Sequence, residues 1–232
     1  MAAITGEVRY DDLAVLMSRM TGAEKHGPSA TSTLDVLWVL YDRVLNVSPR
    51  TVDDPGRDRF VLSKGHGPMA YYAVLAAKDF LDPDLLDGFA SVDSPLGHHP
   101  DRLLVSGVEV SSGSLGHGLP LAVGMALALR AQGLHAARVV CLLGDAELDE
   151  GSNAEAIAFA GRAGLDALTV VVVDNSSASW GWPGGIASRF AVEGWRTADV
   201  NGRDHAALEA ALTDVRDGRP TAVVAAVEPK EA

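Results

Sequence analysis

Cysteine is almost missing from this sequence, and positive charge is scarce. The 232 residues include one cysteine, Cys141, so no disulfide can form within the chain and a reducing compartment suits it. Lysine and arginine number 19 against 31 acidic residues, which gives a formal net charge of -12. This balance argues against nucleic acid and against an anionic membrane surface as partners.

Long apolar runs are also lacking. No stretch approaches the roughly 18 apolar residues of a membrane-spanning helix, and the beginning, MAAITGEVRYDDL, lacks the basic-then-apolar pattern of a secretion signal. No internal repeat or low-complexity tract is present. We therefore expect a soluble, cytoplasmic protein with one domain over residues 1–232, a length that supports one full α/β core.

Short runs rich in valine and leucine alternate with helical patterns along the chain. Strands are expected at 60–62, 138–143, 168–173, 196–200 and 221–227, and helices at 11–20, 32–46, 69–77, 119–131, 152–162 and 204–216. Strand-helix-strand connections make the joined strands parallel. The pattern predicts an α/β fold with a doubly wound, mainly parallel sheet, helices on both faces, and a ligand at the carboxyl ends of the strands.

An acid and an amide follow two neighbouring strands of this predicted sheet. Asp145 comes after the run 138–143, and Asn175 comes just after the run 168–173. Residues 152–155 match a capping box, so a helix is expected to begin between the two strands. Mg²⁺ prefers oxygen ligands and completes its shell with phosphate oxygens and water. Either residue alone is more simply a polar turn residue, but the pair predicts a metal-diphosphate site.

Two glycine-rich segments stand immediately before predicted helices. Residues 112–118 precede the helix at 119–131, and residues 63–67 precede the helix at 69–77. Such loops expose backbone groups to a ligand. The alternatives are an ordinary glycine-rich helix start and, for His66, a solvated or capping histidine.

Four segments match the pattern of one known family, and they do so in order. They are RFVLSKGHGPMAYYAVLA (59–76), SPLGHHPD (94–101), GVEVSSGSLGHGLPLAVGMALA (107–128) and GDAELDEG (144–151), in which 28 residues (147–174) separate GDA from Asn175. Together they resemble the amino-terminal, diphosphate-binding part of a transketolase, from about His26 to about Val227. The resemblance implies thiamine diphosphate and Mg²⁺ as cofactors. It also implies transfer of a two-carbon ketol unit from a ketose, usually phosphorylated, to an aldose.

The resemblance also assigns roles to individual residues. The metal ligands would be Asp145, Asn175 and the carbonyl of Ser177. The residues lining the cofactor would be His66, Gly113, Ser114, Leu115, Gly116, Gly144, Asp145, Ala146 and Asn175. The catalytic residues would be His26, His66, His99 and Glu150, with His98 competing for the role of His99. Glu150 looks like the family's acid at the subunit interface, although a first-turn acid serving the following helix is an equal alternative.

Several positions depart from the family pattern. Ala146 replaces a glycine, and its β-carbon would be harmless at negative φ and costly at positive φ. Ser176 stands where asparagine is common, and Glu147 and Asp149 add negative charge near the expected diphosphate. The segment 179–185 replaces the usual loop, and the later substrate-site histidine of the family is absent.

The matched motifs account for the diphosphate side of a site only. In the family, the glutamate that activates the cofactor comes from a separate pyrimidine-binding domain. We therefore expect activity only with a carboxyl-terminal transketolase subunit, in a heterotetramer acting on sugar phosphates. The alternatives are the α-subunit of a 2-oxo-acid dehydrogenase or related decarboxylase, and a non-catalytic assembly partner that retains the fold.

Overall fold

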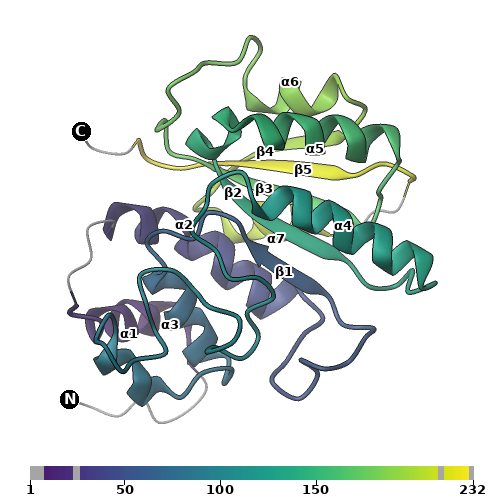
Figure 1. The fold of residues 1–232 in the computed structure, drawn as a ribbon. Coiled ribbons are helices and arrows are strands. Elements are labelled where there is room, and N and C mark those ends of the chain that lie inside the picture. The colour runs from purple at the N-terminus through teal and green to yellow at the C-terminus, as the bar shows by residue number, and fades with distance from the viewer. Residues whose placement is uncertain (1–7, 23–26, 214–216, 230–232) are drawn as a thin grey trace.

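Five parallel strands form the centre of the structure (Figure 1). In this computed structural model, which describes residues 8–22, 27–213 and 217–229, the strands lie in the order β1-β2-β3-β5-β4. Their bounds are β1 (Arg59–Leu62), β2 (Val139–Gly144), β3 (Leu168–Asp174), β4 (Arg196–Asn201) and β5 (Thr221–Ala226). Every pairing is parallel. The predicted α/β fold is thus confirmed.

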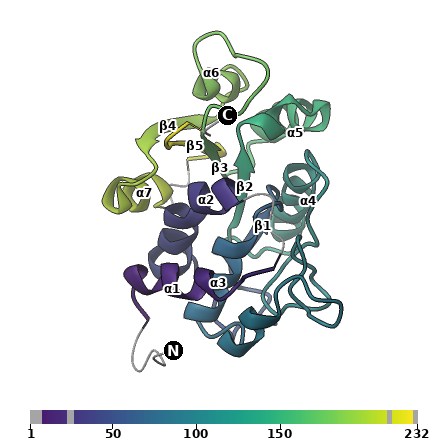
Figure 2. The ribbon, with the colours of Figure 1, turned by 90° about the vertical axis from the view of Figure 1, so that its left-hand side faces the viewer.

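Helices cover both faces of the sheet (Figures 1 and 2). The core on one face includes α1 (Leu13–Ser18), α2 (Gly27–Val39), α3 (Met69–Ala77) and α7 (His205–Leu212), and the core on the other includes α4 (Gly118–Ala131), α5 (Gly151–Arg162) and α6 (Ile186–Ala191). The helices α4, α5 and α6 lead to β2, β3 and β4 in one direction across the sheet, whereas α7 leads back to β5. Right-handed crossovers therefore place α7 on the opposite face.

Successive residues of the central strands alternate between the two hydrophobic cores. In β2, Val140 and Leu142 face one core, and Cys141 and Leu143 face the other. All four are at most 1% exposed, which explains why the apolar run of this strand is uninterrupted. Burial raises the pKa of the Cys141 thiol well above its ordinary value, so this cysteine is an inert packing residue.

Some details differ from the sequence expectations. The helix expected at 32–46 begins earlier, as α2, and ends in a π-helical turn, Leu40–Val44. The capping box expected at 152–155 is wrong, because α5 begins at Gly151 and the Ser152 hydroxyl donates to the carbonyl of Gly116 at 2.7 Å instead. The six-residue α6 and the 3-10 segment Pro83–Gly88 were not predicted. Within the described parts of the chain, no helix is long and apolar enough to span a membrane.

A buried ion pair fastens the amino ends of β1 and β2 together. Asp58 and Arg138 directly precede these strands, and their side chains are only 4% and 8% exposed. The Asp58 carboxylate accepts the Arg138 backbone N–H at 2.8 Å and a guanidinium N–H at 3.0 Å. The guanidinium also donates to the carbonyls of Leu212 and Val44. This pair therefore joins the sheet to the end of α7 and to the π-helical turn.

Asp58→Asn is expected to lower the free energy of unfolding by about 3 kcal/mol, because it leaves the buried Arg138 guanidinium without a carboxylate. Urea denaturation of the purified chain measures this loss. The control is Asp217→Asn at the exposed Asp217–Arg219 pair, which should leave the unfolding midpoint unchanged. An Asp58→Asn midpoint equal to that of the wild type would contradict the expectation.

Candidate active site

The carboxyl ends of β2 and β3 bring Asp145 and Asn175 to the same edge of the sheet. Gly144 is level with Val173 in the parallel register, and the Asp145 N–H donates to the Val173 carbonyl at 3.1 Å. Both polar residues are nearly enclosed, with 2% of Asp145 and 3% of Asn175 exposed. The convergence expected from the strand pattern is therefore present in the structure.

The Asp145 carboxylate organises the turn that follows β3. It accepts the backbone N–H of Ser177 at 2.6 Å, the Ser177 hydroxyl at 2.6 Å and the backbone N–H of Ala178 at 3.0 Å. A carboxylate has about four acceptor positions, so these bonds leave room for one further ligand. Asp145 and Ser177 thus lie together, as a shared metal site would require.

Asn175 presents an oxygen that the surrounding protein does not use. Its Oδ1 atom is buried and has no hydrogen-bond partner among the described residues. An unsatisfied buried amide oxygen costs about 1–3 kcal/mol, and it commonly marks the position of an ion or water. Among the described residues, no group of three or more His, Cys, Asp or Glu side chains is arranged to hold a metal. A cation here would therefore combine one carboxylate with amide, carbonyl and ligand oxygens, a set that suits Mg²⁺.

Ser176, between the two polar positions of this turn, has left-handed backbone geometry. Its φ is 56°, a conformation that asparagine adopts more readily than serine. The Ser176 N–H donates to Oδ1 of Asp174 at 3.0 Å, and this bond helps to hold the turn. The departure from asparagine at this position therefore carries a local conformational cost.

The glycine loop, residues 112–118, packs tightly against two other parts of the chain. Gly113 and Gly116 have φ values of +141° and +77°. A β-carbon at Gly116 would lie 2.6 Å from Cβ of Glu150, and one at Gly113 would lie 3.1 Å from the ring of His99. Glycine is favoured at both positions by conformation, and at Gly116 also by space. Leu115, from the middle of this loop, is half-buried, whereas Ser114 is exposed.

The structure separates the candidate histidines. His99 adjoins Gly113 of the glycine loop, whereas the His98 ring packs edge-on against Phe89, with centroids 5.8 Å apart. His99 is therefore the better-placed neighbour of the site. His66 is half-buried between β1 and α3. His26 lies outside the described residues.

Glu150 is exposed at the N-cap of α5, and its side chain makes no capping hydrogen bond. Its β-carbon packs against Gly116 of the glycine loop. The acid therefore adjoins the loop while remaining exposed. Its role at a subunit interface stays a prediction.

Glu147, which the sequence places near the expected diphosphate, is turned into the protein. It is 1% exposed, and its Oε1 accepts the Gly116 N–H at 2.9 Å and the hydroxyl of Ser63. Its Oε2 is 3.4 Å from the N–H of Gly144. Burial raises the pKa of the Glu147 carboxyl, while these three hydrogen bonds and the charge of Lys64 act in the opposite direction. Its charge near a diphosphate stays a prediction.

Lys64 places a buried cation at the same edge of the sheet. It directly follows Ser63, is 5% exposed, and its ammonium donates to the Ser32 hydroxyl on α2 at 3.0 Å. Its aliphatic stem covers Gly144, where a β-carbon would approach Lys64 Cδ to 3.1 Å. Neither Ser63 nor Lys64 was among the site residues expected from the sequence. The one signal that could have found them was a pair of polar residues directly after β1.

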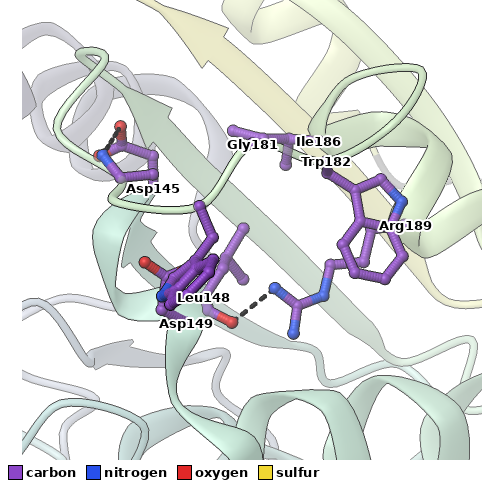
Figure 3. Close-up of a pocket in the computed structure, with 9 residues that line it drawn as sticks. Asp145, Leu148, Asp149, Gly181, Trp182, Ile186 and Arg189 are labelled. Atoms are coloured by element: carbon purple, nitrogen blue, oxygen red, sulfur yellow. Dashed lines mark hydrogen bonds between the residues drawn. The ribbon is translucent and has the colours of Figure 1, made fainter.

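The segment that replaces the family's usual loop forms one wall of a cavity beside Asp145. The cavity measures about 360 Å³ and is lined by Asp145, Leu148, Asp149, Ala178, Trp180, Gly181, Trp182, Ile186 and Arg189. In Figure 3, Asp145 and Arg189 lie on opposite sides of it. The Arg189 guanidinium lies 4.9 Å from the centre of the Trp182 ring and donates to the carbonyl of Leu148. Arg189 of α6 thus connects this segment to the 3-10 turn Ala146–Asp149 that follows Asp145.

Ala146 fits its position without strain. It begins the 3-10 segment Ala146–Asp149, and it is not among the described non-glycine residues with positive φ, which are Asp79, Ala90 and Ser176. A β-carbon is harmless in this conformation. The replacement of the family glycine at position 146 therefore has no backbone cost.

Comparison with known proteins identifies the family. Residues 14–227 match the family described as "Transketolase, thiamine diphosphate binding domain". The chain belongs to the transketolase family and carries its thiamine diphosphate-binding domain. The solved transketolase from Leishmania mexicana superposes with a TM-score of 0.75 at 25% identity, over 95% of this chain and 37% of that one. The transketolase from Campylobacter jejuni gives 0.75 at 25% identity, over 94% and 38%. The chain therefore spans little more than a third of these solved transketolases.

Curated relatives of similar length include separate transketolase subunits. One of the subunits of an apulose-4-phosphate transketolase from Actinobacillus succinogenes is 34% identical over 218 residues, which cover 91% of this chain and 79% of that protein. The 6-deoxy-6-sulfo-D-fructose transketolase subunit SqwG from a Clostridium species is 33% identical, over 86% and 75%. A protein named Ferredoxin fas2, from Rhodococcoides fascians, is 63% identical, over 95% and 73%.

Ala146→Gly, which restores the family residue, is expected to leave the affinity for thiamine diphosphate within about twofold of the wild-type value, because Ala146 does not need positive φ. Calorimetric titration with thiamine diphosphate and Mg²⁺, in the presence of a partner subunit, measures this affinity. Tightening by about tenfold or more would show that the β-carbon hinders the cofactor, contrary to the observed backbone.

Proposed function

We propose that this chain is the diphosphate-side subunit of a two-subunit transketolase. Its reaction would transfer a two-carbon ketol unit from a ketose to an aldose, with thiamine diphosphate and Mg²⁺. The observation that carries this proposal is the pairing of Asp145 with Asn175, whose buried Oδ1 lacks a partner in the described chain. The family match supports the same cofactor.

The residues present fit a magnesium diphosphate. Asp145 has an acceptor position left after its three hydrogen bonds, and Asn175 offers Oδ1. The carbonyl of Ser177 would be a third ligand from the chain. Diphosphate oxygens and water would complete an octahedral shell. The buried Lys64, beside Gly144, adds positive charge at this edge and favours an anionic ligand there.

The chain's other site residues would position the cofactor and the sugar. Gly113 would offer its carbonyl to the aminopyrimidine, with Leu115 packed beside it and Gly116 supporting the loop. His66 would face the diphosphate, and His99, beside Gly113, would donate or accept protons at substrate hydroxyls, a task for which imidazole is suited near neutral pH. When bound, thiamine diphosphate supplies the nucleophilic carbon that cleaves the ketose.

The relatives with named sugars support a proposal for the substrate class. Apulose 4-phosphate and 6-deoxy-6-sulfofructose are both ketoses that carry an anionic group, a phosphate or a sulfonate. We therefore propose a ketose bearing a terminal anion as the donor. Because the chain has a formal net charge of -12, local cations would be needed to hold that group.

A second polypeptide would complete the site. Two of the similar relatives are each named as a subunit of a transketolase. The chain spans 37% of a solved transketolase. The partner would supply the pyrimidine-binding domain and its activating glutamate. Such a partner would cover apolar side chains that are exposed in this chain. They are Leu127 on α4, Phe159 on α5 and Trp180 beside the cavity.

An electron-transfer role, which the name of the 63% identical relative would suggest, has no support in this chain. Iron-sulfur clusters are held by several cysteine thiolates, usually four. This chain has only Cys141, which is fully buried within β2. The region shared with that relative is the transketolase-like region, so a cluster would need cysteines from elsewhere.

Asp145→Asn is expected to weaken magnesium-dependent binding of thiamine diphosphate at least about tenfold, because it removes a carboxylate from the metal site while keeping its shape. Calorimetric titration and circular dichroism, both with the partner subunit present, measure affinity and folding. Asp217→Asn is the control, since Asp217 is exposed, pairs with Arg219 and precedes the amino end of β5, at the opposite edge of the sheet. Equal affinity for Asp145→Asn and wild type would remove Asp145 from the metal site.

The chain alone is expected to show no ketol transfer, and to gain it when mixed with a polypeptide that carries a pyrimidine-binding domain. The reason is that the matched motifs supply the diphosphate side alone. Donor-ketose cleavage, followed together with sedimentation of the mixture, tests activity and assembly at once. Robust turnover by the unmixed chain would refute the half-site proposal.

A further inference from the structure

Three segments that surround the proposed cofactor site meet at one buried carboxyl group. Glu147 contacts Ser63 after β1, Gly116 in the glycine loop, and Gly144 at the end of β2. We propose that Glu147 is a positioning residue, whose Oε1 atom holds the glycine loop against the carboxyl edge of the sheet before any ligand binds. Its effect on cofactor binding rests on the proposed function above, whereas its effect on the loop does not.

The contacts of Oε1 form a continuous chain through the glycine loop. Oε1 accepts the N–H of Gly116 and the hydroxyl of Ser63, and Ser63 Oγ in turn accepts the N–H of Gly118 at 3.0 Å. Both loop amides are therefore used inside the protein and are not directed at a ligand. The amides of Gly116 and Gly118 are therefore not available to a cofactor. Glu147 thus determines which backbone groups of this helix start a diphosphate can reach.

The loop is fastened from its other side as well. The Ser152 hydroxyl, at the start of α5, donates to the Gly116 carbonyl at 2.7 Å. The backbone carbonyl of Glu147 accepts from the side-chain amide of Asn153, also on α5, at 2.6 Å. Gly116 is therefore held through both its N–H and its carbonyl, in a position where a β-carbon would not fit. Because Gly116 is held from both sides, its position relative to Oε1 is fixed inside the protein.

The role requires an acceptor atom, not a negative charge. Oε2 makes only a long contact, 3.4 Å from the Gly144 N–H, whereas the two close donors both point at Oε1. Glutamine can keep its oxygen at Oε1 and place its amide nitrogen at Oε2. Methionine, of similar length, has no comparable acceptor and would leave the Ser63 hydroxyl and the Gly116 N–H without their partner. Glutamine should therefore preserve the function, and methionine should abolish it.

The first experiment measures amide hydrogen exchange by NMR on the unliganded full chain. Glu147→Met should accelerate exchange at Gly116 and Gly118 about tenfold or more, relative to the amides of β3, and Glu147→Gln should leave both near wild type. Ser63→Ala should accelerate Gly118 more than Gly116, since it removes the hydroxyl that Gly118 contacts. Asp58→Asn is the control for general destabilisation, because its ion pair lies at the opposite edge of the sheet. Unchanged exchange in both Glu147→Met and Ser63→Ala would overturn the proposal.

The second experiment titrates the complex of chain and partner subunit with thiamine diphosphate and Mg²⁺. Glu147→Met should bind about tenfold or more weakly, whereas Glu147→Gln and Asp58→Asn should stay within about twofold of wild type. Equal affinity for Glu147→Met and wild type would overturn the positioning role. If Glu147→Gln binds the cofactor as weakly as Glu147→Met, the acceptor argument is overturned. If the wild-type complex binds no cofactor, the proposed function fails, and the exchange experiment still decides whether Glu147 holds the loop.

Discussion

Backbone hydrogen bonds between β2 and β3 fix the register of the two strands, so that both end at the same edge of the sheet. Because Gly144 is level with Val173, the acid after one strand and the amide after the next emerge side by side. A slip of one residue in this register would turn every side chain of the strand to the opposite face, and it would separate Asp145 from Asn175. The valine and leucine side chains that fill both cores prevent such a slip. The position of the proposed metal site is therefore determined by core packing.

Several energetically costly features gather above these strand ends. Lys64, Asp145, Glu147 and Asn175 are all buried at one edge of the sheet, and Ser176 adopts a left-handed conformation there. Buried charges and backbone strain persist only where neighbouring contacts hold them. Here the contacts come from loops that are held by α5 and by the ends of β1 and β2. The stable sheet thus supports a set of polar groups that would not remain ordered on their own.

The sequence was sufficient for regular elements and insufficient for contacts between distant loops. The β2 and β3 runs and the helix at 69–77 were predictable because each is a local apolar pattern. The six-residue α6 was missed because it is short and follows a segment rich in glycine and tryptophan. The role of Glu147 was not predictable, because its partners Ser63 and Gly116 lie 84 and 31 positions away. The Ser152 hydroxyl was misassigned for the same reason, since its partner is Gly116 and not its own helix.

The strand order has a consequence for the way this chain must fold. β5 lies between β3 and β4 and pairs with both, although it follows both of them along the chain. During synthesis, β3 and β4 are therefore made before the strand that joins them, and each has an edge that stays unpaired until residues 221–226 emerge. Unpaired edges of apolar strands promote association between chains, and parallel sheets form slowly. Completion of the sheet, and with it of the edge that carries the site, depends on the last of these five strands to leave the ribosome.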